Sequence, residues 1–130
     1  MRPLAATFAS ILSLSLPGAA LPEGATKLLD CDVTRVCDAA GRCEPASGHV
    51  AFRMQPTELE AAGAGHYTLD YGDIEAEMQA MSDSGPFFWT VGTQRHALIV
   101  SSATQWLWHE LDVGPRPEAT IRFLACSFEQ

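Results

Sequence analysis

Apolar and polar residues alternate at every second position along most of the chain from residue 49 onward. Val50, Phe52 and Met54, for example, would share one face of an extended strand. Similar runs cover residues 66–71, 74–79, 87–91, 96–101, 104–111 and 119–128. Clusters of Gly, Pro, Ser and Asp separate the runs, which is typical of short strands joined by tight turns. The pattern therefore predicts about eight short antiparallel strands connected as a meander.

Only residues 56–62 are compatible with a helix. Thr57 could cap it and Gly63 would end it, so it would have at most two turns. The expected fold class is therefore all-β, as a small barrel or a two-sheet sandwich.

The chain contains four cysteines, which are Cys31, Cys37, Cys43 and Cys126. An even number in a small exported domain predicts disulfides, with three possible connectivities. The segment Asp38–Gly41 has the residues of a type I turn and would place Cys37 opposite Cys43 in a hairpin. Cys31 then pairs with Cys126, which favours barrel closure because it joins the first strand to the last. A four-thiolate metal site is disfavoured, since no C-x2-C spacing occurs.

The first twenty residues have the order of a secretory signal. Arg2 supplies positive charge, residues 4–16 are mostly apolar, and Pro17–Ala20 ends in small residues. We expect cleavage after Ala20, which leaves residues 21–130 as a single all-β domain in the periplasm or the medium. A lipid anchor on Cys31 is less favoured because an acidic residue precedes it. The absence of Asn, with Arg in excess of Lys, is typical of GC-rich bacterial coding.

Acidic residues dominate the charged positions, and the formal net charge of the chain is −8. Lys27 is the single lysine. This balance disfavours nucleic acid and anionic membrane surfaces as partners, because both require basic patches. The only long apolar run lies in the expected signal peptide, so no transmembrane segment is expected after its cleavage.

Two hairpins carry histidines that could serve a metal. A turn at Ser102–Ala103 would place Arg95 opposite Glu110 and His96 opposite His109, a pair suited to a transition metal or to pH sensing. The favoured interpretation is two half-exposed histidines at a sheet rim. The sequence at His109 also begins like a zincin motif, but the second histidine of that motif is missing.

The second hairpin, with its turn at Tyr71–Gly72, would place His66 opposite Glu77. Asp70 and Glu75 would lie on the same face. Carboxylates beside an imidazole could bind a cation or serve acid–base catalysis. A solvated face that keeps the protein soluble is the favoured interpretation.

The strongest candidates for a ligand site are Trp89, Trp106 and Trp108. The expected register puts the last two on one face of their hairpin with Ala97 and Ile99, while the opposite face is also apolar. One of these faces would belong to the core. The other would be covered, line a ligand cavity or form a contact patch.

No G-x-S-x-G elbow and no glycine-rich phosphate loop occurs in the sequence, and no cofactor is expected. The expected architecture resembles small ligand-binding barrels and periplasmic lysozyme-inhibitor barrels, although motifs of neither group occur. We therefore expect an exported, non-enzymatic β-domain that binds a small apolar ligand or a protein partner. The alternatives are an envelope-enzyme inhibitor or interaction module, and a metal-binding protein or small metal-dependent enzyme.

Overall fold

The computed structural model describes residues 24–129, so the expected signal peptide lies outside the described residues. The strands are β1 (Lys27–Asp38), β2 (Cys43–Pro45), β3 (His49–Leu59), β4 (Gly65–Tyr71), β5 (Ile74–Ala80), β6 (Phe87–Val91), β7 (Gln94–Val100), β8 (Gln105–Asp112) and β9 (Glu118–Glu129). A short 3-10 helix, η1 (Ala61–Gly63), joins β3 to β4. Within residues 24–129, no helix has the length and apolar character needed to cross a membrane.

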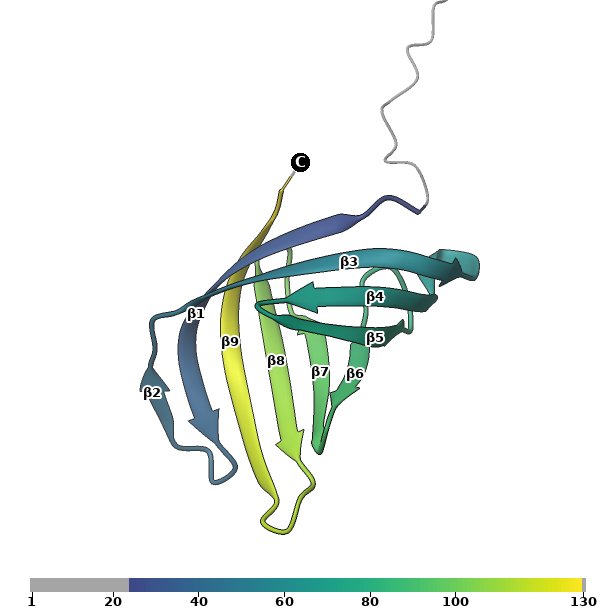
Figure 1. The fold of residues 1–130 in the computed structure, drawn as a ribbon. Coiled ribbons are helices and arrows are strands. Elements are labelled where there is room, and N and C mark those ends of the chain that lie inside the picture. The colour runs from purple at the N-terminus through teal and green to yellow at the C-terminus, as the bar shows by residue number, and fades with distance from the viewer. Residues whose placement is uncertain (1–23, 130) are drawn as a thin grey trace, which may run out of the picture.

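The strands form one antiparallel sheet that closes into a barrel (Figure 1). From β3 to β9, each strand pairs with the next along the chain, as expected for a meander. β1 pairs with both β3 and β9, which closes the barrel, and β2 adds to the second half of β1. The all-β prediction is thus confirmed, and the architecture is a barrel rather than a two-sheet sandwich.

The interior is filled by the alternate residues that the sequence pattern marked as apolar. Phe52, Met54, Leu69, Leu98 and Leu124 are all 0% exposed. Successive side chains of a strand point to opposite faces of the sheet, so the chain neighbours of each of these residues lie on the outside. The core is therefore built from one residue in every two along each strand.

Both expected disulfides are present. Cys31 and Cys126 join β1 to β9, and Cys37 and Cys43 close the first hairpin. The turn between the latter pair is held by Asp38, whose Oδ1 accepts hydrogen bonds at 2.9 Å from the backbone N–H of Ala40 and of Arg42. Two disulfides in so small a domain are typical of proteins that mature in an oxidising compartment.

The expected helix at residues 56–62 is wrong. Pro56–Leu59 continue β3, with a bulge between Pro56 and Glu58, and only η1 is helical. Pairing with β4 satisfies the backbone of this segment, and such tertiary hydrogen bonds override a weak local helix preference. The Tyr67 hydroxyl donates a 2.9 Å hydrogen bond to the Gly63 carbonyl. This contact fixes η1 over one end of the barrel.

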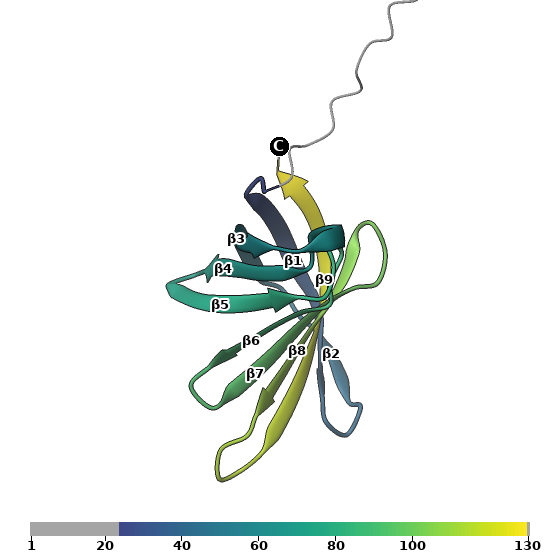
Figure 2. The ribbon, with the colours of Figure 1, turned by 90° about the vertical axis from the view of Figure 1, so that its right-hand side faces the viewer.

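The opposite end of the barrel is open on one side. β5 and β6 pair only between Met78–Ala80 and Phe87–Trp89, close to the η1 end. Beyond these pairs the β4–β5 and β6–β7 hairpins diverge, and Figure 2 shows their tips well apart. The sheet is therefore split where β5 begins and β6 ends.

Candidate binding site at the open end of the barrel

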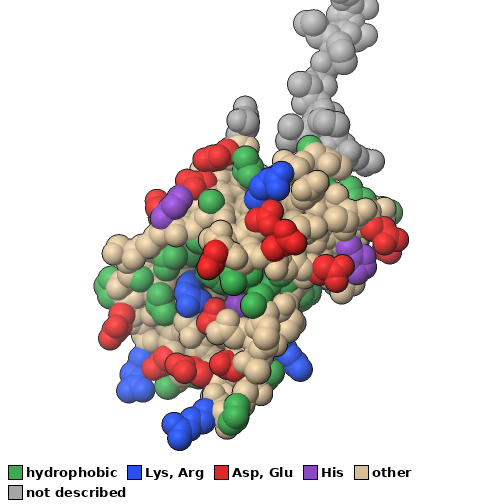
Figure 3. All heavy atoms as spheres, viewed as in Figure 1, with side chains coloured by type: hydrophobic (Ala, Val, Ile, Leu, Met, Phe, Trp, Pro, Cys, Tyr) green, Lys and Arg blue, Asp and Glu red, His purple; other side chains and the backbone are tan. Residues whose placement is uncertain are grey.

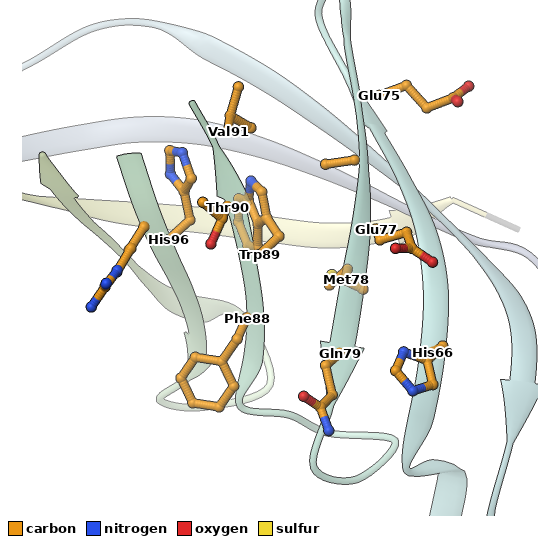
Figure 4. Close-up of a pocket in the computed structure, with 12 residues that line it drawn as sticks. His66, Glu75, Glu77, Met78, Gln79, Phe88, Trp89, Thr90, Val91 and His96 are labelled. Atoms are coloured by element: carbon orange, nitrogen blue, oxygen red, sulfur yellow. The ribbon is translucent and has the colours of Figure 1, made fainter. Parts of the chain in front are cut away.

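The split between β5 and β6 forms a groove of about 810 Å³. Its residues come from four strands: His66 of β4, Glu75–Gln79 of β5, Phe88–Val91 of β6, and Arg95 and His96 of β7. Figure 4 shows the side chains of β5 along one side and those of β6 and β7 along the other. The groove therefore runs through the barrel wall and reaches residues that belong to the interior.

The groove has polar rims and an apolar floor. Glu75 and Glu77 are exposed on the outer face of β5, whereas Met78 and Trp89 are buried. This contrast follows from the strand alternation, which sends neighbouring side chains to opposite faces. On the face drawn in Figure 3, hydrophobic side chains also reach the surface between acidic ones. A ligand in the groove would thus meet both charged and apolar groups.

Two stacked rings line the groove. The rings of Trp89 and His96 lie 4.9 Å apart between centroids and are inclined by only 7°. The indole N–H of Trp89 donates a 3.1 Å hydrogen bond to the Tyr71 hydroxyl. The Trp89 ring is therefore held from two sides, by stacking and by a hydrogen bond.

His96 is the one buried polar or charged residue of the described chain, with 4% exposure. Its Nδ1 accepts a 3.1 Å hydrogen bond from the indole N–H of Trp108. In the neutral ring, an accepting Nδ1 places the proton on Nε2. Nε2 is buried and has no hydrogen-bond partner in the described structure. His96 therefore holds an unused N–H donor beside the groove.

An ion pair lies next to His96 inside the barrel. Nη1 of Arg122 contacts Oε2 of Glu110 at 3.3 Å, and the side chains are only 26% and 20% exposed. The Arg122 guanidinium also lies 4.7 Å above the ring of Trp108. Charges in such a position are costly unless they are paired, which the Glu110 contact and the cation–π contact provide.

The surroundings of His96 keep its ring neutral. Burial lowers the pKa of His96 below its usual range, Glu110 opposes this shift, and Arg122 adds to it. Glu110 Oε2 lies 3.7 Å from Nδ1 of His96, but that nitrogen already accepts from Trp108. Burial likewise raises the pKa of the Tyr71 hydroxyl, against the hydrogen bond from Trp89. Both groups are thus neutral at pH 7 and act as hydrogen-bonding groups.

The three tryptophans lie at different places in the barrel. Trp89 lines the groove, and Trp108 donates its indole N–H to Nδ1 of His96. Trp106 is 3% exposed and stacks on Phe87 at 6.0 Å, away from the groove. A ligand role for all three remains a prediction, and the geometry brings only Trp89 to the groove.

The expected pairing of His96 with His109 is wrong. His96 lies opposite Glu110, and His109 lies opposite Ala97 on the outer face. Five residues, an odd number, separate the last β7–β8 pair of Val100 and Trp106, and a 2.9 Å hydrogen bond from Ser101 N–H to the Gln105 carbonyl closes this turn. The expected register assumed an even loop, and a slip of one residue moves every side chain to the other face.

The same slip corrects the faces of this hairpin. Trp106 and Trp108 share the inner face with Leu98, and not with Ala97 and Ile99 as expected. The expected opposition of Arg95 and Glu110 is also wrong, since Arg95 lies opposite Leu111.

The expected pairing of His66 with Glu77 is wrong as well, because His66 lies opposite Gln79. The turn is the two-residue Gly72–Asp73 loop, which shifts the register by two positions and so preserves the face. His66, Asp70, Glu75 and Glu77 do share the outer face, as expected. Among residues 24–129, no three His, Cys, Asp or Glu side chains gather in a way that could hold a metal ion.

The outer side of β6–β9 is a second unusual surface, which we call the apolar outer face. Cross-strand rows on this side join Phe88, Ala97, Ile99, Leu107, His109, Leu111, Ile121 and Phe123. Phe88 is 43% and Leu111 is 41% exposed. The rows contain Arg95 but no acidic residue, although the chain has 16 of them. Exposed apolar surface of this kind is typical of contact sites.

Tyr71, Glu110 and Arg122 belong to the site but were not among the residues expected from the sequence. A signal existed for two of them: Glu110 stands two residues after the inward Trp108, and Arg122 stands two residues before the inward Leu124. That signal can be recognised only when the inward-facing residues of β8 are known, and the misplaced turn exchanged the inner and outer residues of this strand. Nothing in the sequence distinguished Tyr71 from a core residue, because an aromatic residue at an inward strand position is normally part of the hydrophobic core.

No family model matches the chain, and neither a curated protein nor a solved structure shows significant similarity to it.

Proposed function

We propose that the protein is an exported, non-enzymatic binding protein that holds its ligand in the β5–β6 groove. The ligand carries an apolar group and a hydrogen-bond acceptor. The observation that carries this proposal is the buried Nε2 of His96, which has no partner although it lies beside the groove.

An unpartnered buried donor costs about 1–3 kcal/mol, and an acceptor on a ligand would recover part of that cost. The ring of His96 cannot turn to find another partner cheaply, because Trp89 stacks on it and Trp108 binds its Nδ1. The floor residues Met78 and Trp89 would bury the apolar part of the ligand. An apolar site with one oriented polar group is the usual composition of a ligand pocket.

Titration with 1-anilinonaphthalene-8-sulfonate tests the proposal, since this dye combines an apolar ring system with an anionic acceptor. We expect saturable dye fluorescence and quenching of tryptophan emission. His96→Met has a side chain of similar length without an N–H donor, so it should weaken dye binding about tenfold or more, roughly the 1.4 kcal/mol of one hydrogen bond. His109→Met on the outer face is the matched control. Equal affinities of the two variants would refute the proposal.

A second candidate function is that of a protein-interaction module, for example an inhibitor of an envelope enzyme. The apolar outer face favours it, because four strands present apolar side chains there without a single acidic residue. The test is a pull-down from periplasmic extract, comparing the native protein with Leu111→Asp. A partner retained by the native protein and by Glu75→Gln but lost by Leu111→Asp would support this function. Identical recovery by all three would count against it.

Export belongs to the same proposal and is supported by the two disulfides, which are typical of proteins in an oxidising compartment. Expression of the full chain in a Gram-negative host, followed by fractionation and N-terminal sequencing, tests it. We expect periplasmic protein that begins at Leu21. Protein recovered from the cytoplasm with an intact N-terminus would contradict export.

A further inference from the structure

We infer that the ligand of the β5–β6 groove is an extended peptide segment of a protein partner, in which basic and apolar residues alternate. The segment adds to the barrel as an extra strand along the free edge of β5. This inference rests on the proposed function, because it assigns an occupant to the same groove.

The first half of β5 has a free edge. β5 pairs with β4 along its whole length, from Ile74 to Ala80, but with β6 only from Met78 onward. On the β6 side, the backbone of residues 74–77 therefore has no strand partner. An unpaired edge presents a row of N–H and C=O groups, and an extended peptide can bind to such a row by main-chain hydrogen bonds.

The side chains of this edge select the sequence of the peptide. Glu75 and Glu77 are exposed on the outer face, and neither has an ion-pair partner among residues 24–129. Ala76 lies between them on the inner side and packs against the core. Side chains of an added strand alternate in the same way, so those on the outer face would lie opposite the two carboxylates.

The opposite side of the groove is suited to the apolar residues of such a peptide. Val91 is partly buried and packs on the core, and Trp89 lies beside it at the floor. Apolar side chains of the peptide would point inward to these residues while its basic side chains stay outside. A backbone carbonyl of the peptide also supplies the acceptor that the buried Nε2 of His96 lacks. A small amphiphile could use the floor, but it would leave the β5 edge and both carboxylates unused.

The probe is a fluorescein-labelled hexapeptide that alternates Lys and Val, measured by fluorescence anisotropy against a matched peptide that alternates Glu and Val. We expect saturable binding of the Lys peptide only. The double variant E75Q/E77Q should weaken it about 2- to 30-fold, the effect of two opposite-charge cross-strand pairs. Glu58→Gln, an exposed position on β3 outside the groove, is the control and should bind as the native protein does. Equal binding of the two peptides would overturn the charge assignment.

Two N-methylated forms of the Lys peptide test the added strand itself. One form is methylated at the first, third and fifth residues, and the other at the second, fourth and sixth, so each removes the N–H donors of one edge. Strand addition to β5 predicts that one form loses binding and the other keeps most of it. Equal retention by both forms, or failure of the unmodified peptide to bind, would overturn the inference. Dye binding that depends on His96 would in that case leave the proposed function standing.

Discussion

Nε1 of Trp108 donates a hydrogen bond of 3.1 Å to Nδ1 of His96, and this contact between neighbouring strands fixes the proton of the imidazole on Nε2. The pair lies beside the Glu110–Arg122 ion pair, in an interior that is mostly aromatic and aliphatic. It leaves one donor without a partner at the open end of the barrel.

His96 makes the stability of the protein depend on pH. Burial lowers its pKa in the folded state below the value of about 6.5 in the unfolded chain. The folded state therefore binds fewer protons than the unfolded state in that range, and the free energy of unfolding falls as the pH drops below about 6.5. Urea denaturation from pH 7.5 to 5 measures this slope. His96→Gln should flatten it while His109→Gln should leave it unchanged, and a slope unaffected by His96→Gln would contradict the prediction.

Arg122 is one of three causes that set the pKa of its neighbour His96. Its guanidinium lowers the pKa of His96, whereas Glu110 raises it. Arg122→Leu removes the first effect and leaves the second, so the pKa of His96 should rise. NMR titration of the His96 ring measures the change. Arg53→Leu, which breaks an exposed contact with Asp70 of 3.3 Å, is the matched control. A pKa of His96 that stays constant or falls in Arg122→Leu would show that Arg122 does not lower the pKa of His96.

The two disulfides should differ in their contribution to stability. Cys31–Cys126 spans 95 residues and Cys37–Cys43 spans 6. In the chain-entropy model, removal of the long bridge costs about 4–5 kcal/mol and removal of the short one about 2 kcal/mol. Chemical denaturation of the double variants C31A/C126A and C37A/C43A compares them. A larger loss in the second variant would show that native-state effects outweigh loop entropy.

Gly65 is required where β3 meets β4. Its φ is +129°, and an added Cβ would collide with the carbonyl oxygen of Glu58. Gly65→Ala should therefore lower the free energy of unfolding by clearly more than the roughly 1 kcal/mol that a left-handed alanine costs. Gly92→Ala is the control, since Gly92 has a φ of +58° and nothing within 4 Å of an added Cβ. Thermal unfolding of both variants measures the difference, and equal losses would exclude the collision as the cause.

The alternation of apolar residues was enough to predict an all-β fold and many residues of the core, although the structure has nine strands where about eight were expected. Phe52 and Leu69 are buried because a period of two places them on one face of a sheet, whatever the sheet later pairs with. The disulfides were also predictable, since a local turn at Asp38–Gly41 fixes Cys37 opposite Cys43 and leaves one pairing for the other two. These features depend on local backbone geometry and, for the disulfides, on the number of cysteines left to pair.

The site depended on register, which local sequence does not determine. The odd number of residues between Val100 and Trp106 places His96 inward and His109 outward. The sequence showed no preference between an odd and an even number of residues there. Likewise, the residues of β5 read as an ordinary strand, and only the closed barrel shows that its first half has no partner in β6. Whether a segment forms a strand is determined by side-chain alternation within a few residues. The position of one strand against another is determined by packing and closure of the whole barrel, and this decided which polar groups meet at the open end.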